Sequence, residues 1–250
     1  MSDTRSEIFL AAGFLTRIRF PTVDYSDETM ARATRWYALV GLAIGLTLAV
    51  LFWTLATVLP QSLAALLTAA AGMLFTGALH EDGLADIADG LGGSADRDRA
   101  MEIMRDSRIG TYGVLALGVT LATKVTALAL MPLPAAFAAL VAGHTFGRLS
   151  MTWLMRRLDY ARPDGAAGFM SNIPEINDTP LWAAGTAAGL ILLWFTGPLP
   201  LLLTLLALTI LLKVAAGRLK ARLGGYTGDA LGASEQLCEA LVPIVLLACL

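Results

Sequence analysis

The sequence has few charged residues and very few cysteines and histidines. Only 15% of its 250 residues are Asp, Glu, Lys or Arg, whereas a soluble domain carries about a quarter. Cys238 and Cys249 lie close together in the last apolar segment, a setting that favours packing over a disulfide or a metal pair. With only two histidines besides, an ordinary zinc site is excluded. Walker-type phosphate loops and dinucleotide fingerprints are also missing from the sequence.

In place of charge the chain has long apolar runs. It is 56% hydrophobic, with a mean hydropathy of +0.67. No Asp, Glu, Lys, Arg or His occurs between Arg35 and His80, which is room for two membrane crossings at about 20 residues each. The sequence therefore predicts an all-α, polytopic membrane helix bundle that forms one domain over residues 1–250. The net charge of −2 says little about partners, and we expect the lipid bilayer and no nucleic acid.

We expect about seven transmembrane helices and an N-terminal amphipathic helix. In residues 6–20, Ile8, Ala11 and Leu15 share a helical stripe, which fits a helix on the membrane surface or one packed against the bundle. The last apolar segment is short and could cross only partly. The expected spans are residues 37–59, 62–79, 112–131, 134–155, 181–196, 199–214 and 237–250.

Charged and uncharged connections alternate along the chain. The turns around Pro60, Pro132 and Pro198 carry no charge, and every other connection is charged. With seven spans, all strongly basic connections fall on one face, which the positive-inside rule assigns to the cytoplasm. The N-terminus is then predicted inside and the C-terminus outside.

The clearest sign of chemistry is the segment HEDGLADIADG, residues 80–90. Asp82, Asp86 and Asp89 fall at i, i+4 and i+7, so a helix would carry all three on one face. Clustered carboxylates at a membrane edge need compensation, and a hard divalent cation such as Mg²⁺ is the simplest candidate. The alternative is a solvated acidic loop. His80 is a candidate general base or a neutral residue that anchors the helix end.

Several basic residues are candidates for binding an anion. Arg105 and Arg108 stand beside glycines ahead of a span, which suits phosphate binding or simply marks topology. Lys124, and His144 with Arg148 at i, i+4, lie inside spans and should face the bundle interior. They could balance the aspartates, clamp phosphates or form a structural ion pair.

A glycine-rich segment precedes the last span. Residues 224–233 read GGYTGDALGA, and glycines this dense predict a backbone cradle for an anion. Thr227 adds a hydroxyl and Asp229 a possible metal ligand, although turn-forming glycines alone would give the same pattern.

Taken in order, several motifs resemble the cobalamin synthase family, the adenosylcobinamide-GDP ribazoletransferases. They are FLTRI (14–18), LVG (39–41), GALHEDGLADIADG (77–90), RDSRIGTYGVLAL (105–117) and GGYTGDALGA (224–233). The chain departs from the family near Arg19 and Ala38, where family members usually have prolines. These departures do not touch the acidic segment.

The resemblance implies the last step of cobalamin nucleotide-loop assembly. A hydroxyl of α-ribazole, or of its 5′-phosphate, would attack adenosylcobinamide-GDP, releasing GMP and forming adenosylcobalamin or its phosphate. The implied cofactor is Mg²⁺, and the implied location is the bacterial inner membrane with the active site on the cytoplasmic side. A homo-oligomer, or association with other cobalamin-assembly enzymes, would be compatible with that role.

On this hypothesis each candidate residue has a role. Asp82, Asp86 and Asp89 would bind Mg²⁺, and His80 or one of the aspartates, Asp82 foremost, would take the ribazole proton. Arg105 and Arg108 would hold the pyrophosphate, while the remaining candidates would bind substrate at the polar mouth or within the spans. These remaining candidates are Asp106, Arg148, Thr227 and Asp229.

Two other classes of protein remain open. One is a different membrane transferase acting on diphosphates. A CDP-alcohol phosphotransferase also has clustered aspartates, but with Ala-Arg after the Asp-Gly pair where this chain has Asp86-Ile87, and a prenyltransferase usually spaces its acids differently. The other is a transporter using Asp82, Lys124, His144 and Arg148 as a coupling path, which would predict inverted repeats and interrupted helices. The sequence shows no internal repeat.

Overall fold

The protein is a bundle of helices in a computed structural model that describes residues 4–162, 168–171, 174 and 177–250. Within these ranges the structure has no strand, and only one isolated bridge pairs Tyr160 with Tyr226. The all-α prediction is confirmed. The helices are α1 (Thr4–Leu15), α2 (Asp27–Ala33), η1 (Thr34–Trp36), α3 (Tyr37–Ala56), α4 (Gln61–Thr76), α5 (Leu79–Gly93), α6 (Arg97–Ile103), α7 (Thr111–Leu130), α8 (Leu133–Met155), η2 (Gly168–Ser171), α9 (Thr179–Thr196), α10 (Pro198–Leu223) and α11 (Gly228–Ala248).

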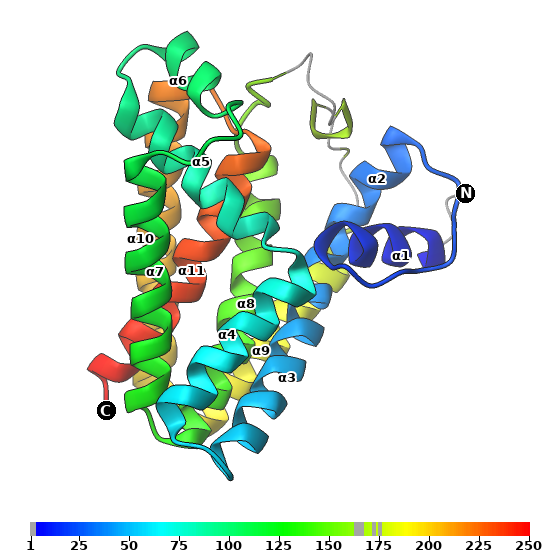
Figure 1. Cartoon of the computed structure of the whole chain (residues 1–250). Helices are drawn as coiled ribbons and strands as arrows, with labels where there is room; N and C mark the ends of the chain where they lie inside the picture. Colours follow the sequence, from blue (N-terminus) through cyan, green and yellow to red (C-terminus); the bar gives the residue numbers. More distant parts are fainter. Residues whose placement is uncertain (1–3, 163–167, 172–173, 175–176) are drawn as a thin grey trace.

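The long helices run roughly along one axis (Figure 1). The short turns between α3 and α4, α7 and α8, and α9 and α10 lie at one end with the C-terminus, and α6 lies at the other end. Within the described residues, five helices are long and apolar enough to cross a membrane, or up to six if the bent pair α4–α5 counts as one span. The multi-pass prediction is thereby confirmed, with helices at all seven expected positions.

Helix α8 is the centre of the bundle. It packs against α3, α9 and α11, and most of its residues are buried. Glycines allow the closest approach, because a Cβ on Gly41 would lie 3.0 Å from the Arg148 Cδ and one on Gly45 would lie 2.9 Å from the Val141 Cα. Since its polar residues, His144 and Arg148, are also buried, α8 carries polar groups into the middle of the protein.

The chain bends by 92° between α4 and α5. Two consecutive residues there are left-handed, Gly77 with φ of 71° and Ala78 with φ of 56°. Only glycine adopts this conformation without strain, so the Ala78 backbone is held by its surroundings. The break turns α5 across the bundle toward α7 and α11, and it ends the predicted span 62–79 at Thr76.

The last helix is longer than the sequence suggested. α11 starts at Gly228, not near residue 237, and is 21 residues long. Thr227 is its N-cap, accepting a hydrogen bond from the Ala230 amide at 3.1 Å. The predicted glycine cradle is therefore wrong for residues 228–233, which are helical. Gly232 serves packing instead, because a Cβ there would lie 3.1 Å from the His80 Cα.

The N-terminal helix packs against the protein. α1 ends at Leu15, short of the predicted residue 20, and the Glu7 side chain on it is fully buried. Glu7 is ion-paired with Arg32 at 3.3 Å and with Arg35 at 2.6 Å, and it accepts a hydrogen bond from the Trp36 indole at 3.0 Å. These contacts fasten α1 to α2 and to the start of α3, as the packed alternative required.

Candidate active site

A cavity of about 630 Å³ opens between α4, α5, α7, α11 and the loop that joins α6 to α7. Its wall mixes apolar side chains with acidic, basic and uncharged polar ones. The cavity is large enough for part of a nucleotide or corrinoid side chain. The polar lining residues are Glu81, Asp82, Asp86, Arg105, Asp106, Ser107, Thr120, Lys124 and Gln236.

Two of the predicted metal ligands face this cavity. Asp82 and Asp86 stand one turn apart on α5, and both line the cavity. Neither carboxylate has an ion pair or a side-chain hydrogen bond to any described residue. Asp229, at the start of α11, is close enough to repel the negative charge on both. Asp229 itself pairs with Arg162, whose Nη1 lies 2.9 Å from its Oδ2.

The third predicted ligand, Asp89, faces the N-terminus of α7. Its Oδ2 accepts a hydrogen bond from the Gly110 amide at 2.7 Å, and its Oδ1 accepts one from the Gly113 amide at 2.8 Å. A carboxylate at a helix N-terminus satisfies free amides and complements the helix dipole. Both glycines are required here, since a Cβ on either would lie 2.5 Å or less from an Asp89 oxygen. Asp89 thus has both oxygens occupied by amides and does not line the cavity with Asp82 and Asp86.

The arginines ahead of α7 divide into two environments. Arg105 lines the cavity. Arg108 does not line it, and its Nη2 donates to Asp106 Oδ2 at 2.6 Å. Hydrogen bonds from the Arg108 side chain and backbone lower the pKa of Asp106 to about 2, so Asp106 is a carboxylate at neutral pH. The pair shapes the mouth of the cavity, where Arg105 is left without a carboxylate partner among the described residues.

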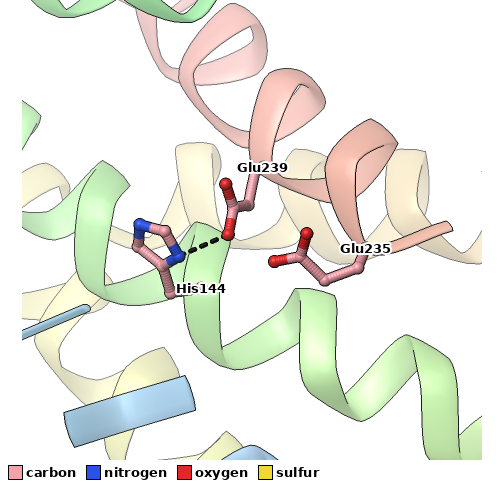
Figure 2. Close-up of side chains that lie close together, drawn as sticks. All are labelled: His144, Glu235 and Glu239. Carbon is pink, nitrogen blue, oxygen red and sulfur yellow. Dashed lines mark ion pairs between the residues drawn. The ribbon is translucent and has the colours of Figure 1, made fainter. Parts of the chain in front are cut away.

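Beneath the cavity lies a network of buried charges between α7, α8 and α11. Arg148, 1% exposed, donates to Glu235 and to Glu239, and Lys124 Nζ lies 2.7 Å from Glu239 Oε2. Figure 2 shows both carboxylates of α11 turned toward α8, with the His144 ring paired to Glu239. Two fixed cations thus face two carboxylates, so the predicted structural ion pair is what the geometry supports.

Geometrically, this network resembles a metal site. Within the described ranges, His144, Glu235 and Glu239 are the only group of three or more potential ligands whose atoms all lie within 4.8 Å of one another. The Arg148 guanidinium already lies between the two carboxylates, however. A guanidinium and an ammonium repel a divalent cation, so this cluster is an ion-pair network and not a metal centre.

Lys124 connects this network to the cavity. Its Nζ lines the cavity and also lies 3.0 Å from Gln236 Oε1, while Gln236 Nε2 donates to Glu81 Oε1 at 3.2 Å. The cavity therefore has one cation at its mouth, Arg105, and another at its inner end. Arg148 is buried behind Lys124, so the structure does not place this predicted substrate ligand at the cavity.

Two further predicted site residues are buried and do not line the cavity. His80 is 1% exposed, and its Nδ1 lies 3.3 Å from Arg148 Nη2. Thr227 is fully buried and caps α11. The sequence reasoning did not identify Arg162 or Glu235 as site residues. Lys124 was recognised in the sequence as a cation inside an apolar span, but Arg162 is one of several arginines in its loop and carries no signal.

The cavity therefore has two carboxylates without partners among the described residues and, separately, two cations, at one end of a membrane bundle. This combination is typical of membrane-embedded transferases that act on phosphorylated substrates.

Comparison with known proteins names the family. The model of a family described as cobalamin-5-phosphate synthase matches residues 7–247. An adenosylcobinamide-GDP ribazoletransferase of Shewanella frigidimarina is 41% identical over 248 residues, covering 96% of this chain and 93% of the relative. The enzyme of the same name from Leptothrix cholodnii is 42% identical over 244 residues, covering 92% and 90%.

The chain belongs to the cobalamin-5-phosphate synthase family and is an enzyme of the transferase class. This membership confirms the resemblance found in the sequence and favours it over a CDP-alcohol phosphotransferase, a prenyltransferase or a transporter. No solved structure matches the chain.

Proposed function

We propose that this enzyme joins α-ribazole, or its 5′-phosphate, to adenosylcobinamide-GDP with release of GMP. The observation that carries the proposal is the family match over nearly the whole chain, together with relatives that bear the name of this activity. A ribazole hydroxyl attacks the phosphorus attached to cobinamide. The bond from that phosphorus to the oxygen of GMP breaks, GMP leaves, and the hydroxyl proton passes to a base.

We further propose that Asp82, Asp86 and Asp229 hold a Mg²⁺ ion. The proposal rests on Asp82 and Asp86, whose carboxylates line the cavity and have no partner among the described side chains. Asp229 is close enough to repel both, but it is paired with Arg162, and the oxygens of the three do not all lie within 4.8 Å of one another. Asp229 would therefore join the ion only by giving up the Arg162 contact. Oxygen ligands of this kind suit Mg²⁺. When bound, the ion would neutralise charge that develops on the phosphoryl oxygens. Asp89, with both oxygens on amides, would support the site by fixing α5 against α7.

The basic residues would hold the diphosphate. Arg105 at the mouth can form paired hydrogen bonds to phosphate oxygens, and Lys124 at the inner end supplies a second positive charge. Asp82, which is exposed to the cavity, is better placed than the buried His80 to accept the ribazole proton at a carboxylate oxygen. The apolar wall, which includes Met73, Leu117 and Leu121, would contact the non-polar parts of the substrates.

The charged end of the bundle would face the cytoplasm, because the water-soluble substrates would reach the active site from there. We propose the bacterial inner membrane as the location, because the basic connections all lie at that end. A homo-oligomer, or contact with other cobalamin-assembly enzymes, is a separate proposal.

The test of this function is nucleotide transfer by the Asp82→Asn variant. Purified enzyme in detergent would receive adenosylcobinamide-GDP, α-ribazole and Mg²⁺, and GMP and corrinoid product would be measured. We expect wild-type enzyme to release GMP in step with corrinoid product, and Asp82→Asn to be slower by at least about 100-fold. Asp98→Asn on α6, whose side chain is 89% exposed, is the matched control and should be fully active.

The outcomes separate the two proposals. Wild-type enzyme without coupled GMP release would overturn the reaction. A normal rate in a folded Asp82→Asn variant would leave the reaction in place and remove the role of Asp82.

A further inference from the structure

A second cavity, also of about 630 Å³, lies on another side of the bundle and shares no residue with the active-site cavity. It is a groove between α9 and α10, with Phe146, Leu149 and Trp153 of α8 behind it. α9 carries glycine at 185 and 189, and a Cβ on Gly189 would meet nothing closer than the Leu201 Cδ1, at 3.9 Å. The missing side chain at Gly189 leaves a gap between two helices that follow each other in the chain, whereas Gly185 packs against α8, since a Cβ there would lie 2.9 Å from the Leu149 Cδ1.

Most of the groove is apolar, but one end is basic. Leucines of α9 and α10 line most of its length. At the basic end the lining residues are Arg157, Lys213, Trp153 and Trp182. Lys213 lies about 22 Å along α10 from Pro198, which begins the helix at the other end of the bundle. The hydrocarbon core of a membrane is about 30 Å thick. The long side chain of Lys213 can therefore reach the headgroup level of the inner leaflet. Tryptophans beside basic residues are typical of that level.

The two cations have no acidic partner in the described part of the chain. Arg157 stacks over the Trp153 ring, with its Cζ 5.5 Å from the centroid, and neither Arg157 nor Lys213 has an ion pair with a described carboxylate. Arg99 and Arg108, exposed at the same end, do have such partners, whereas Arg105 and Arg218 have none among the described residues. The groove therefore combines room for acyl chains with two positive charges left for a ligand.

We propose that this groove binds an anionic glycerophospholipid of the inner leaflet, with its acyl chains between α9 and α10. Its phosphate would lie between Arg157 and Lys213, where a guanidinium can make paired hydrogen bonds. A zwitterionic lipid would return an ammonium group to a site that already has two cations, so a lipid with net negative charge fits better. The bound lipid would fill the gap that separates α9 from α10.

The test is the affinity of the purified full-length protein for phosphatidylglycerol and for phosphatidylcholine, measured by native mass spectrometry after delipidation. We expect wild-type protein to prefer phosphatidylglycerol by at least about five-fold, since each basic side chain near an anionic headgroup strengthens binding by roughly that factor. Arg157→Gln and Lys213→Gln should each reduce this preference. Gly189→Phe should weaken the binding of both lipids by filling the groove.

Matched controls lie on α10 outside the groove. Lys220→Gln removes the same charge, and Gly217→Phe adds the same ring where no atom lies within 4 Å of the new Cβ. Equal affinity of wild-type protein for the two lipids would overturn the proposal. So would an effect of Lys220→Gln as large as that of Lys213→Gln, or unchanged lipid binding in a Gly189→Phe variant that melts at the wild-type temperature.

Discussion

Three aspartates with regular spacing on α5 have different surroundings. Helical periodicity puts Asp82, Asp86 and Asp89 near one face, but the neighbouring helices decide what each one meets. Asp82 and Asp86 face the cavity, while Asp89 is 9% exposed and binds two amides of α7. Substitution of these three aspartates should therefore have different consequences, although their positions in the sequence pattern are equivalent.

Replacing Asp86 and Asp89 one at a time by asparagine should distinguish a residue that binds the metal from one that fixes α5 against α7. Asp86→Asn should raise the Mg²⁺ concentration needed for half-maximal activity, because it removes a negative charge beside the proposed ion. Asp89→Asn should leave that concentration unchanged and lower the free energy of unfolding by about 1–2 kcal/mol, because one amide loses its acceptor and the helix N-terminus loses a charge. Activity against Mg²⁺ concentration and thermal unfolding in detergent are the measurements. A weaker Mg²⁺ response in Asp89→Asn would restore Asp89 as a ligand.

Arg148 is a second residue whose role the sequence left open. Because it is buried between Glu235 and Glu239, Arg148→Met should leave one carboxylate unpaired and destabilise the protein by about 3–5 kcal/mol. Arg148→Lys keeps the charge and should be milder. The measurement is unfolding in detergent, with Arg218→Met, an exposed change at the end of α10, as the control. An Arg148→Met protein of normal stability that binds adenosylcobinamide-GDP poorly would instead support the substrate role.

At the scale of elements, glycines mark where helices cross. The crossing of α5 and α11 places Gly83 against the Asp229 backbone and Gly232 against His80. Close helix contact of this kind needs small residues, and here it brings Asp229 to the aspartates of α5. Glycines around an acidic segment can instead leave room for a metal and a bulky ligand. At Gly83 that room is occupied by another helix.

Adding one methyl group at this crossing should disturb the site. A Cβ on Gly83 would lie 2.8 Å from the Asp229 carbonyl oxygen and 3.0 Å from its Cα, so the backbone of one helix must move. Gly83→Ala should therefore cost about 1–3 kcal/mol of stability and raise the Mg²⁺ concentration for half-maximal activity. Gly217→Ala, on an open face of α10, should do neither. A fully active Gly83→Ala enzyme with normal Mg²⁺ response would show that the position of Asp229 is unimportant.

For the whole molecule, the sequence predicted the class of fold well. Long uncharged runs and the alternation of charged with uncharged connections depend on local composition, which a membrane constrains strongly. Helix ends were less accurate where local signals conflict, as at Gly228, where glycines that look like a loop continue into a helix. The bend at Gly77 and Ala78 carries no distinct pattern, because tertiary contacts hold an alanine in a left-handed conformation.

The site was predicted only in part, because it combines segments far apart in the chain. The aspartates of α5 and Arg105 were recognisable from their own neighbourhoods. The approach of Asp229 to Asp82, and of Arg162 to Asp229, depends on how α8 and α11 pack. The pairing of Lys124 and Arg148 with glutamates of α11 was missed for the same reason, since the last span was expected to begin beyond Glu235.

The proposed cytoplasmic location of the active site depends on the orientation of the molecule in the membrane. A membrane-impermeant maleimide added to intact spheroplasts should label a cysteine at Val58, in the turn after α3, and leave one at Asp98, on α6, unlabelled until the cells are opened. Both side chains are exposed, so only the membrane can protect either. Cys238 is buried and should stay unlabelled, and Cys249 would be replaced by serine. The reverse labelling pattern would put the aspartates of α5 outside the cell, away from the nucleotide substrates, and would contradict the proposed cytoplasmic site.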